Sequence, residues 1–256
     1  MHPIITNALE GRSAIGCFLS EIAAPNILRI YRASGVEFVI VDCEHGAFDY
    51  SQVAALAAVG NGIGLPVLVR IPCVAREHVQ KYLDAGADGL LVPMISTADS
   101  AREAVQYAKY APLGRRGAST MRPHSEYNPG KLSEYMAKAN GRTMVFVQIE
   151  TQEGVQNALD IARVDGLDGL FVGPNDLSID YGAPGDFHTP AMEEAVKKVI
   201  GSASQAGKPS GVIASDMAYL HWCQALGMRL FSCNSEVGLL AQRTKSMVTE
   251  FKDIKK

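Results

Sequence analysis

The sequence predicts a single (β/α)8 barrel, and three observations support that fold class. Apolar strand-like runs alternate with amphipathic helical segments at a repeat of about 30 residues, the spacing of consecutive βα units. Runs such as MVFVQI and GLFVG are apolar at almost every position, as in strands buried on both faces of a parallel sheet. The chain has 256 residues, of which 47% are hydrophobic, and this length suits one eight-stranded barrel. We therefore expect one domain over residues 1–256.

Strands are expected where short apolar runs are bounded by Gly, Pro or polar residues. Their predicted positions are 14–18, 37–43, 66–71, 89–93, 144–149, 169–173, 210–214 and 229–233. Helical spacing of apolar residues occurs between them, at 24–34, 51–61, 75–86, 101–111, 153–164, 190–207 and 216–227. Several of these segments close with Gly, which favours a helix C-terminus.

Two further segments complete the chain. Residues 111–143, between the fourth and fifth strands, are rich in Pro, Gly, Arg and Asn, and we expect an irregular loop there. A loop of that length in a compact domain is usually functional. The chain closes with a helix at 236–256, which we expect to contact a neighbouring subunit.

Charge and cysteine content exclude several classes of protein. The formal net charge is −3 with acids and bases interspersed, which argues against a nucleic-acid or anionic-membrane surface. The five cysteines are odd in number and lack CxxC spacing, so we expect reduced thiols in a cytoplasmic protein. The first residues show no signal-peptide core, and no apolar run reaches membrane-spanning length. We expect a soluble protein that is not exported.

Two strands end in polar residues that could bind a cation. The first delivers Gln148 and Glu150, and the second Gly173, Pro174, Asn175 and Asp176. In parallel sheets, chemistry gathers at the carboxyl ends of strands. Glu150 and Asp176 could be oxygen ligands of a divalent cation, or they could serve in helix capping and salt bridges. As two acids at neighbouring strand ends, they favour the metal site.

Other strand ends contribute to the same candidate site. The second strand finishes with Asp42, Glu44 and His45, and the third with Arg70. Taken singly, His45 could be a surface histidine, and Arg70 and Asp42 could form an ion pair. An arginine that closes an apolar run needs a fixed anionic partner, because burying a guanidinium is costly. Together with Pro93 at the end of the fourth strand, these residues occupy five strand ends and indicate a catalytic floor.

These motifs resemble a known enzyme family. The segments VDCEHGAFDY, LVRIP, LDAGADGLLVPMISTADSAREAVQYAKYAPLGRRG, VQIETQEGV and VGPNDLSIDYG are similar to those of the HpcH/HpaI family of metal-dependent class II 2-oxo-acid aldolases. They occur in the family's order, over roughly residues 13–241. The resemblance implies a (β/α)8 barrel that assembles as a homohexamer, a dimer of trimers. It also implies that Glu150 and Asp176 hold a Mg, Mn or Co ion.

The resemblance further implies the reaction and several residue roles. The enzyme would cleave or form 4-hydroxy-2-oxo acids from pyruvate and an aldehyde. Arg70 is expected to support the enolate oxygen of pyruvate and His45 to serve in acid–base steps, with Asp42 as a further catalytic residue. Substrate binding is expected of Arg70, Gln148, Gly173, Pro174, Asn175 and Val212.

Asp84 has two interpretations. It lies near the end of the helix expected at 75–86, away from the strand ends of its own subunit. The resemblance implies that it supports His45 of a neighbouring subunit. The structural alternative is a surface ion pair with Lys81 or Arg76, which would contribute little to stability.

Elementary chemistry makes the implied roles reasonable. Cleavage leaves negative charge on the C2 oxygen of pyruvate, which a divalent ion and Arg70 would stabilise. His45, with an ordinary pKa of about 6.5, suits the relay of the C4 hydroxyl proton near neutral pH. Gln148 could orient a water on the ion, and backbone N–H groups after Gly173 and Asn175 could bind the substrate carboxylate.

The chain departs from the family pattern where the second substrate would lie. Many relatives have Trp at Phe18, an apolar residue at Arg115, Ala or Ser at Asn175, Gly at Asn234 and Asp at Glu236. The aldehyde is expected to be placed by Phe48, Arg115, Arg122 and the loop 118–130.

Two other functions are compatible with this scaffold. One is a different carbon–carbon lyase or condensing enzyme, citrate-forming or malyl-CoA-like, that uses the same enolate chemistry. The other is a non-catalytic binding protein, which would have little need for the whole set of acids, arginine and histidine. A Schiff-base aldolase would need a lysine at a strand end, and none of the expected strands ends in one.

Overall fold

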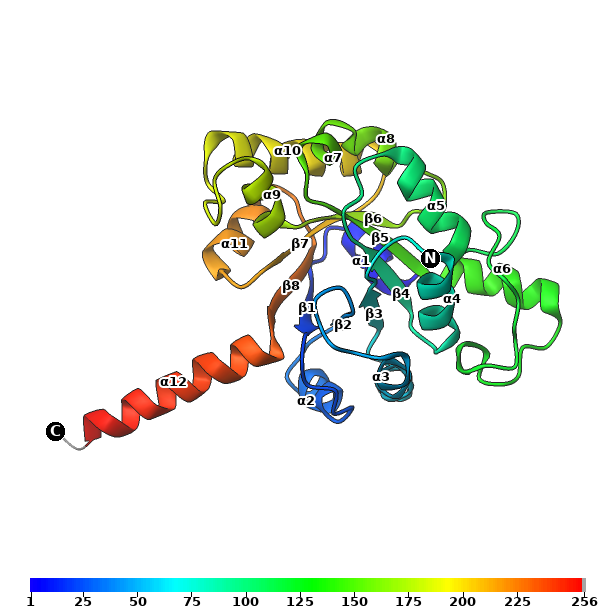
Figure 1. The fold of residues 1–256 in the computed structure, drawn as a ribbon, viewed down its shortest axis with the longest axis horizontal. Coiled ribbons are helices and arrows are strands. Elements are labelled where there is room, and N and C mark those ends of the chain that lie inside the picture. Colours follow the sequence, from blue (N-terminus) through cyan, green and yellow to red (C-terminus); the bar gives the residue numbers. More distant parts are fainter. Residues whose placement is uncertain (255–256) are drawn as a thin grey trace.

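The computed structural model describes residues 1–254, whose strands form a closed parallel barrel (Figure 1). Each strand pairs with the next along the chain, and β8 pairs with β1 to close the barrel. The strands are β1 (Ala14–Leu19), β2 (Phe38–Asp42), β3 (Val67–Arg70), β4 (Gly89–Val92), β5 (Met144–Ile149), β6 (Gly169–Val172), β7 (Ser210–Ala214) and β8 (Leu230–Ser235). Every predicted strand is present, and the (β/α)8 fold class is confirmed.

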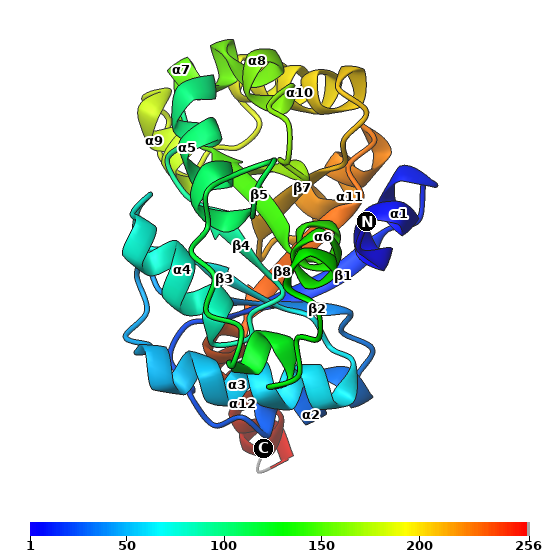
Figure 2. The same cartoon turned by 90° about the vertical axis from the view of Figure 1, so that its right-hand side faces the viewer.

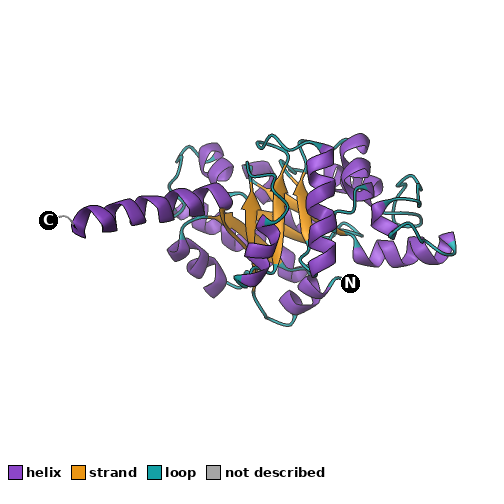
Figure 3. Ribbon diagram, turned by 90° about the horizontal axis from the view of Figure 1, so that it is seen from below, coloured by secondary structure: helices purple, strands orange, loops and turns teal. Residues whose placement is uncertain are grey.

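Helices cover the outside of the barrel. Figure 2 shows α8 and α10 on one side of the strands and α2 and α3 on the opposite side, and Figure 3 shows the strands enclosed among helices. The helices are α1 (Pro3–Leu9), α2 (Ile27–Ala33), α3 (Tyr50–Ile63), α4 (Arg76–Asp84), α5 (Ala98–Ala108), α6 (Leu132–Arg142), α7 (Gln152–Gln156), α8 (Ala158–Ala162), α9 (Pro174–Asp180), α10 (Pro190–Gln205), α11 (Met217–Ala225) and α12 (Glu236–Ile254), with a 3-10 turn η1 at Pro123–Ser125. Among residues 1–254, no helix is both long and apolar enough to cross a membrane.

Three segments differ from the sequence prediction. The stretch 111–143 is not irregular throughout, because its second part, LSEYMAKANGR, consists mainly of helix formers and folds as α6. The helix expected at 153–164 divides into α7 and α8 at Asn157, whose Nδ2 donates to the carbonyl oxygen of Ser96 at 2.8 Å. The sequence did not predict α1, which packs Ile5 and Ala8 against the core inside the barrel.

Successive residues of each strand point alternately into the barrel and outward to the helices. The interior is filled by Phe38, Ile40, Leu68, Leu91, Met144, Phe146, Phe171 and Leu230. These inward rows continue to the carboxyl ends of the strands. Two residues after Ile40, Leu68 and Phe146 stand Asp42, Arg70 and Gln148. The polar residues therefore form a layer directly above a packed apolar floor.

Strand β8 is irregular near its end. Gly16 of β1 lies opposite Ser232, whereas Phe18 lies opposite Ser235, so β8 contains one residue more than β1 in this interval. Such a β-bulge changes the direction of the side chains around it. Within the bulge, Asn234 has a φ of 65°, in the left-handed region that Asn tolerates better than most residues. Two consecutive residues, Asn234 and Ser235, consequently reach the same end of the barrel.

Helix α12 does not pack along the barrel as the other helices do. Figure 1 shows it extending away from β8. Apolar side chains along it are 39–81% exposed, namely Val237, Leu239, Leu240, Met247, Val248, Phe251 and Ile254. Its first residue, Glu236, is buried, and its carboxylate accepts hydrogen bonds of 2.6–2.9 Å from the backbone N–H groups of Ser20, Glu21 and Ile22. This contact fixes the start of α12 to the loop after β1.

Candidate active site

A cavity of about 440 Å³ opens at the carboxyl ends of the strands. One half is lined by His45, Arg70, Gln148 and the segment 173–176, from the ends of β2, β3, β5 and β6. The other half is lined by Phe18, Ser20, the segment 213–215, Asn234 and Ser235, from the ends of β1, β7 and β8. The structure thus brings His45, Arg70, Gln148, Gly173, Pro174, Asn175 and Asp176 together around one space, as the sequence predicted.

A buried ion pair holds Arg70 at the floor of this cavity. Its Nε and Nη2 donate to the two carboxylate oxygens of Asp42 at 2.9 and 2.7 Å, and its Nη1 lies 3.1 Å from Oε2 of Glu44. The guanidinium also lies over the ring of Phe18, 4.9 Å from the ring centroid. Burial alone would lower the pKa of Arg70, but Asp42 and Glu44 outweigh burial and raise it. Arg70 is therefore a fixed, permanent positive charge.

Asp42 also organises the turn that carries His45. Besides binding Arg70, its Oδ1 accepts hydrogen bonds from the backbone N–H groups of Glu44 and His45 at 3.1 and 3.3 Å. The imidazole of His45 is 69% exposed, and its Nε2 lies 3.9 Å from Oε2 of Glu44. A histidine held by its backbone but exposed at its ring is available to exchange protons with a bound molecule.

Glu150 lies beside the cavity, behind Gly173 and Gln148. Its carboxylate is buried and accepts hydrogen bonds from the backbone N–H of Met94, at 2.6 Å, and from the side-chain amide of Gln148. Met94 is in the left-handed region, with φ 55°, and this unusual backbone directs its N–H at Glu150. A Cβ on residue 173 would collide with the carboxylate, so glycine is needed there.

The carboxylates of Glu150, Asp176 and Glu44 lie near enough to influence one another's pKa, and two of them could hold a divalent cation. Burial, together with the nearby carboxylates of Asp176 and Glu44, raises the pKa of Glu150 to about 7, although the hydrogen bond from Met94 opposes the shift. Burial likewise raises the pKa of Glu44, although Arg70 opposes the shift. Acids arranged in this way repel one another unless a cation lies among them. Glu150 and Asp176 are the two acids that could hold such a cation. The remaining coordination positions of the ion would be left to substrate and water.

The amide of Gln148 supports the same interpretation. Its nitrogen is bound to Glu150, while its buried Oε1 has no hydrogen-bond partner among the described residues. A buried oxygen without a donor is unfavourable by about 1–3 kcal/mol. A water or ligand donor in the cavity would satisfy it. Within residues 1–254, no three acidic, histidine or cysteine side chains converge into a complete metal centre, so a bound ion would need such additional ligands.

Several residues expected at the site lie elsewhere. Val212 faces the outer core between barrel and helices, and its neighbour Ile213 lines the cavity instead. Phe48 is buried in that outer core, Arg115 lies over the ring of Tyr107, and Arg122 donates to Ser119. None of these four lines the cavity. A part for these residues in substrate binding therefore stays a prediction, which the cavity of the single subunit does not support.

Asp84 lies at the end of α4, remote from this cavity. Its Oδ1 accepts a 2.6 Å hydrogen bond from Nη2 of the buried Arg116 and lies 3.5 Å from Nε2 of His124. The alternative of an ion pair with Lys81 or Arg76 is wrong, because Lys81 pairs with Glu77 and the partner of Asp84 comes from the loop after α5. Asp84 is thus held rigidly at the edge of a surface groove that also includes Arg122.

The sequence did not predict the part that β1, β7 and β8 contribute to the cavity. Ser215 and Ser235 are small polar residues of a kind common in loops, and only strand alternation could have placed Ser215 inward. The side chain of Asn234 reaches the cavity because of the bulge, which the sequence pattern does not reveal.

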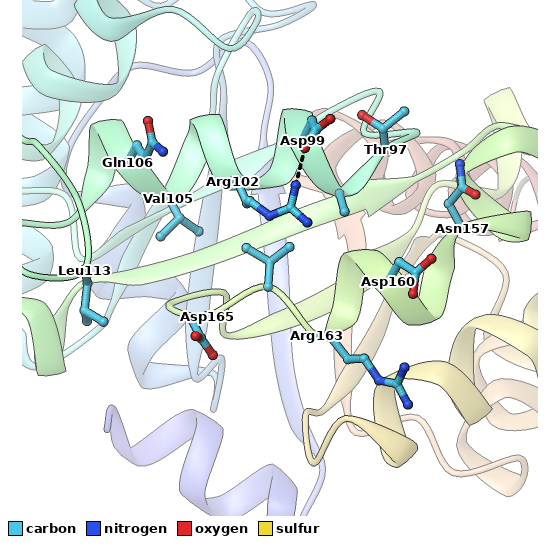
Figure 4. A pocket seen from close by; sticks show the side chains of 12 residues that line it. Thr97, Asp99, Arg102, Val105, Gln106, Leu113, Asn157, Asp160, Arg163 and Asp165 are labelled. Carbon is cyan, nitrogen blue, oxygen red and sulfur yellow. Dashed lines mark hydrogen bonds and ion pairs between the residues drawn. The ribbon is translucent and has the colours of Figure 1, made fainter.

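A second hollow, of about 630 Å³, lies on the outer wall between α5 and α8 (Figure 4). Asp99 and Arg102 pair with each other on α5, and Asp160 and Arg163 lie across from them. These charges alternate in sign on exposed helix surfaces. No buried polar side chain with an unmet hydrogen bond lines this hollow in the described chain. It offers no equivalent of the converging groups at the strand ends.

Comparison with known proteins finds relatives that match nearly the whole chain. Residues 14–241 match the family model HpcH/HpaI aldolase/citrate lyase. A 5-keto-4-deoxy-D-glucarate aldolase of Escherichia coli O6:H1 is 32% identical over 93% of this chain and 92% of its own. The crystal structure of an HpcH/HpaI aldolase from Desulfitobacterium hafniense DCB-2 is similar, with a TM-score of 0.92 and 34% identity over 96% of this chain and 95% of that one. The citrate synthase SbnG has a TM-score of 0.86 and 27% identity, over 98% of both chains.

The raised pKa of Glu150 predicts how the metal-free protein responds to pH. Between the ordinary value of 4.5 and about 7, the folded protein keeps a proton that the unfolded chain has lost. The free energy of unfolding should therefore fall as pH rises through this interval, by on the order of 3 kcal/mol at most. Urea unfolding of chelator-treated protein at several pH values measures this, and Glu150→Gln should lack the dependence. An identical pH profile in the variant would show that Glu150 titrates normally.

Proposed function

The chain belongs to the HpcH/HpaI aldolase/citrate lyase family and is a carbon–carbon lyase, an aldolase, and we propose that it cleaves and forms 4-hydroxy-2-oxo acids. The products of cleavage would be pyruvate and an aldehyde. The single observation that carries this proposal is the cavity in which a fixed Arg70 charge, an exposed His45 ring and Asp176 meet, with Glu150 beside it. A pyruvate-release assay over a panel of 4-hydroxy-2-oxo acids, with and without chelator, tests it.

We propose that Glu150 and Asp176 hold a Mg, Mn or Co ion. The buried, mutually repelling carboxylates and the unpaired oxygen of Gln148 support this proposal. When bound, the ion would act as a Lewis acid that stabilises negative charge on the oxygen atoms of the 2-oxo acid.

The side chains and backbone of the cavity would carry out proton transfer, enolate stabilisation and substrate orientation. For cleavage, a base removes the proton of the C4 hydroxyl, the C3–C4 bond breaks, and its electrons pass to the C2 oxygen as an enolate. Arg70, held by Asp42, is placed to stabilise that charge. His45 is the group placed to take the hydroxyl proton and to return a proton to C3, which forms the methyl group of pyruvate. The backbone after Gly173 and the side chains of Gln148 and Asn175 would orient the substrate carboxylate.

A second candidate is a condensing enzyme that joins an enolate to a keto acid. The similarity to the citrate synthase SbnG over nearly the whole chain supports it. Arg70, Glu150 and Asp176 suit both the aldolase reaction and the condensation. The difference between the two reactions would lie in the cavity wall that contacts the second substrate.

We also propose that the active protein is a homohexamer, built from single-domain subunits in the cytoplasm. The five cysteines are all free, which supports a reducing compartment. The outer surface of β1 and β8 carries an apolar hollow of about 200 Å³ bordered by Ile15, Met217 and Phe231, and no residue of α12 within 236–254 lines it. An exposed apolar helix and an uncovered apolar slot on one subunit suit exchange of α12 between copies. The groove with Asp84 would face a neighbouring site and support its His45.

Activity should require the divalent ion. Exhaustive chelation should abolish turnover, and added Mn²⁺ should restore it and raise the melting temperature, because ligand binding to the folded state stabilises it. Calorimetry and pyruvate release measure the two effects. In Glu150→Gln both responses should disappear, whereas full activity after chelation would rule out the metal site.

Arg70 should act on the rate of the chemical step. Arg70→Ala removes the charge that faces the developing enolate and should lower kcat by roughly a hundredfold, with a smaller change in KM. Arg70→Lys should recover only part of the loss, because an ammonium cannot match the paired hydrogen bonds to Asp42. Steady-state kinetics of the two variants measure kcat and KM. A changed KM with unchanged kcat would mean that Arg70 only binds substrate.

Assembly should be needed for activity. Leu240→Asp places a charge on the exposed face of α12 and should shift the protein to smaller species in light scattering, with activity falling in parallel. Asp84→Asn should lower activity while the Mn²⁺-induced rise in melting temperature persists, and Asp99→Asn, at an exposed position of α5, is the matched control. Full specific activity of a stable monomer would contradict the shared site.

A further inference from the structure

The half of the cavity formed by β1, β7 and β8 differs in chemistry from the half that would bind pyruvate. Every ionisable side chain that lines the cavity in the described chain belongs to the first half: His45, Arg70 and Asp176. The second half has no charged side chain among the described residues, and its polar groups are hydroxyls and one amide. Because the first half accommodates the reacting 2-oxo acid, the second half is where the aldehyde would lie.

The amide of Asn234 has hydrogen-bond capacity that the protein leaves unused. Its Oδ1 accepts from the backbone N–H of Ser235 at 2.8 Å, which orients the side chain, and no residue within 1–254 accepts a hydrogen bond from its Nδ2. The hydroxyl of Ser235 accepts from the backbone N–H of Gly238. The hydroxyl of Ser215 has no partner among the described contacts and lines the same half of the cavity. Unused donors at a cavity wall are suited to bind polar atoms of a ligand.

The backbone at Asn234 indicates that this arrangement is specific. A left-handed residue inside a β-bulge is less favourable than a regular strand, and such features are frequent beside active sites, where they aim a side chain. Without the extra residue, β8 would present only one of Asn234 and Ser235 to the cavity.

A carboxylate on the aldehyde would be poorly accommodated in the second half. Arg70 is already bound by both oxygens of Asp42 and by Glu44, and the second half supplies no other cation. An alkyl group would leave the donors of Asn234 without partners, which is unfavourable. A hydroxyl group can accept from Nδ2 of Asn234 and donate to the oxygen of Ser215.

We propose that Asn234 and Ser215 bind a hydroxyl group of the aldehyde, so that the enzyme prefers small, uncharged hydroxy-aldehydes. This inference rests on the proposed aldolase function. The volume of about 440 Å³ must hold both reactants, which limits the aldehyde to a few heavy atoms. Asn234 and Ser215 are specificity-determining residues, and Arg70 and His45 keep the roles described above.

Two matched pairs of aldehydes test the preference in addition reactions with pyruvate and the Mg²⁺-loaded enzyme. Glycolaldehyde and propionaldehyde differ by a hydroxyl in place of a methyl, and D-glyceraldehyde and tartronate semialdehyde by a hydroxymethyl in place of a carboxylate. The hydroxylated, uncharged member of each pair should have a kcat/KM at least about tenfold higher. Equal rates, or a preference for the carboxylated aldehyde, would overturn the inference.

Variants locate the preference in the cavity wall. Asn234→Gly removes the amide but tolerates the left-handed backbone, and Ser215→Ala removes the hydroxyl. Each should bring the ratio of glycolaldehyde to propionaldehyde rates several-fold closer to one, and the exposed Ser34→Ala, remote from the cavity, should keep the native ratio. A native ratio in both Asn234→Gly and Ser215→Ala would contradict the assignment.

Exchange of the methyl protons of pyruvate in D₂O, followed by NMR, separates this inference from the proposed function. Exchange requires only formation of the enolate and no aldehyde. Exchange together with the wrong aldehyde preference overturns the inference alone. Absence of both exchange and aldol product overturns the proposed function, and the inference with it.

Discussion

The buried ion pair between Arg70 and Asp42 is the interaction on which the rest of the site depends. A guanidinium cannot stay at the floor of a barrel without an anion bound to it, because desolvation is too unfavourable. Asp42 meets this need with two hydrogen bonds and, with the same carboxylate, fixes the turn that presents His45. One carboxylate thus sets the position of both groups that would handle charge and protons. The apolar floor below, from Ile40, Leu68 and Phe146, fixes the height of this layer.

The charges above that floor balance only as a group. Arg70 offsets Asp42 and part of Glu44, whereas Glu150 and Asp176 form an excess of negative charge once Glu150 loses its proton. The glycine at 173 and the unusual backbone of Met94 maintain this excess, since they let the Glu150 carboxylate stay buried against β6. Two local backbone requirements therefore keep in place an arrangement that is unfavourable without a cation.

The sequence predicted the barrel and the charged half of the cavity because both depend on local patterns. Arg70, Gln148 and Asp176 stand at the ends of apolar runs, where position along the strand determines location. It could not settle orientation where one residue of register matters, since Val212 and Ile213 look alike in sequence but face opposite sides of the sheet. It failed at α6, whose helix formers follow a run of turn residues, and at the β8 bulge, which depends on pairing with β1. Asp84 required the tertiary fold, because its partner Arg116 lies 32 residues along the chain.

The contact between Glu236 and the loop after β1 joins two parts of the molecule that would otherwise be independent. Ser20 lines the cavity and donates its backbone N–H to Glu236, which is also the first residue of α12. The first residue of the helix is therefore attached to the rim of the pocket. A molecule that moved these 19 residues would therefore act on the loop at Ser20, Glu21 and Ile22, and through it on the wall of the pocket.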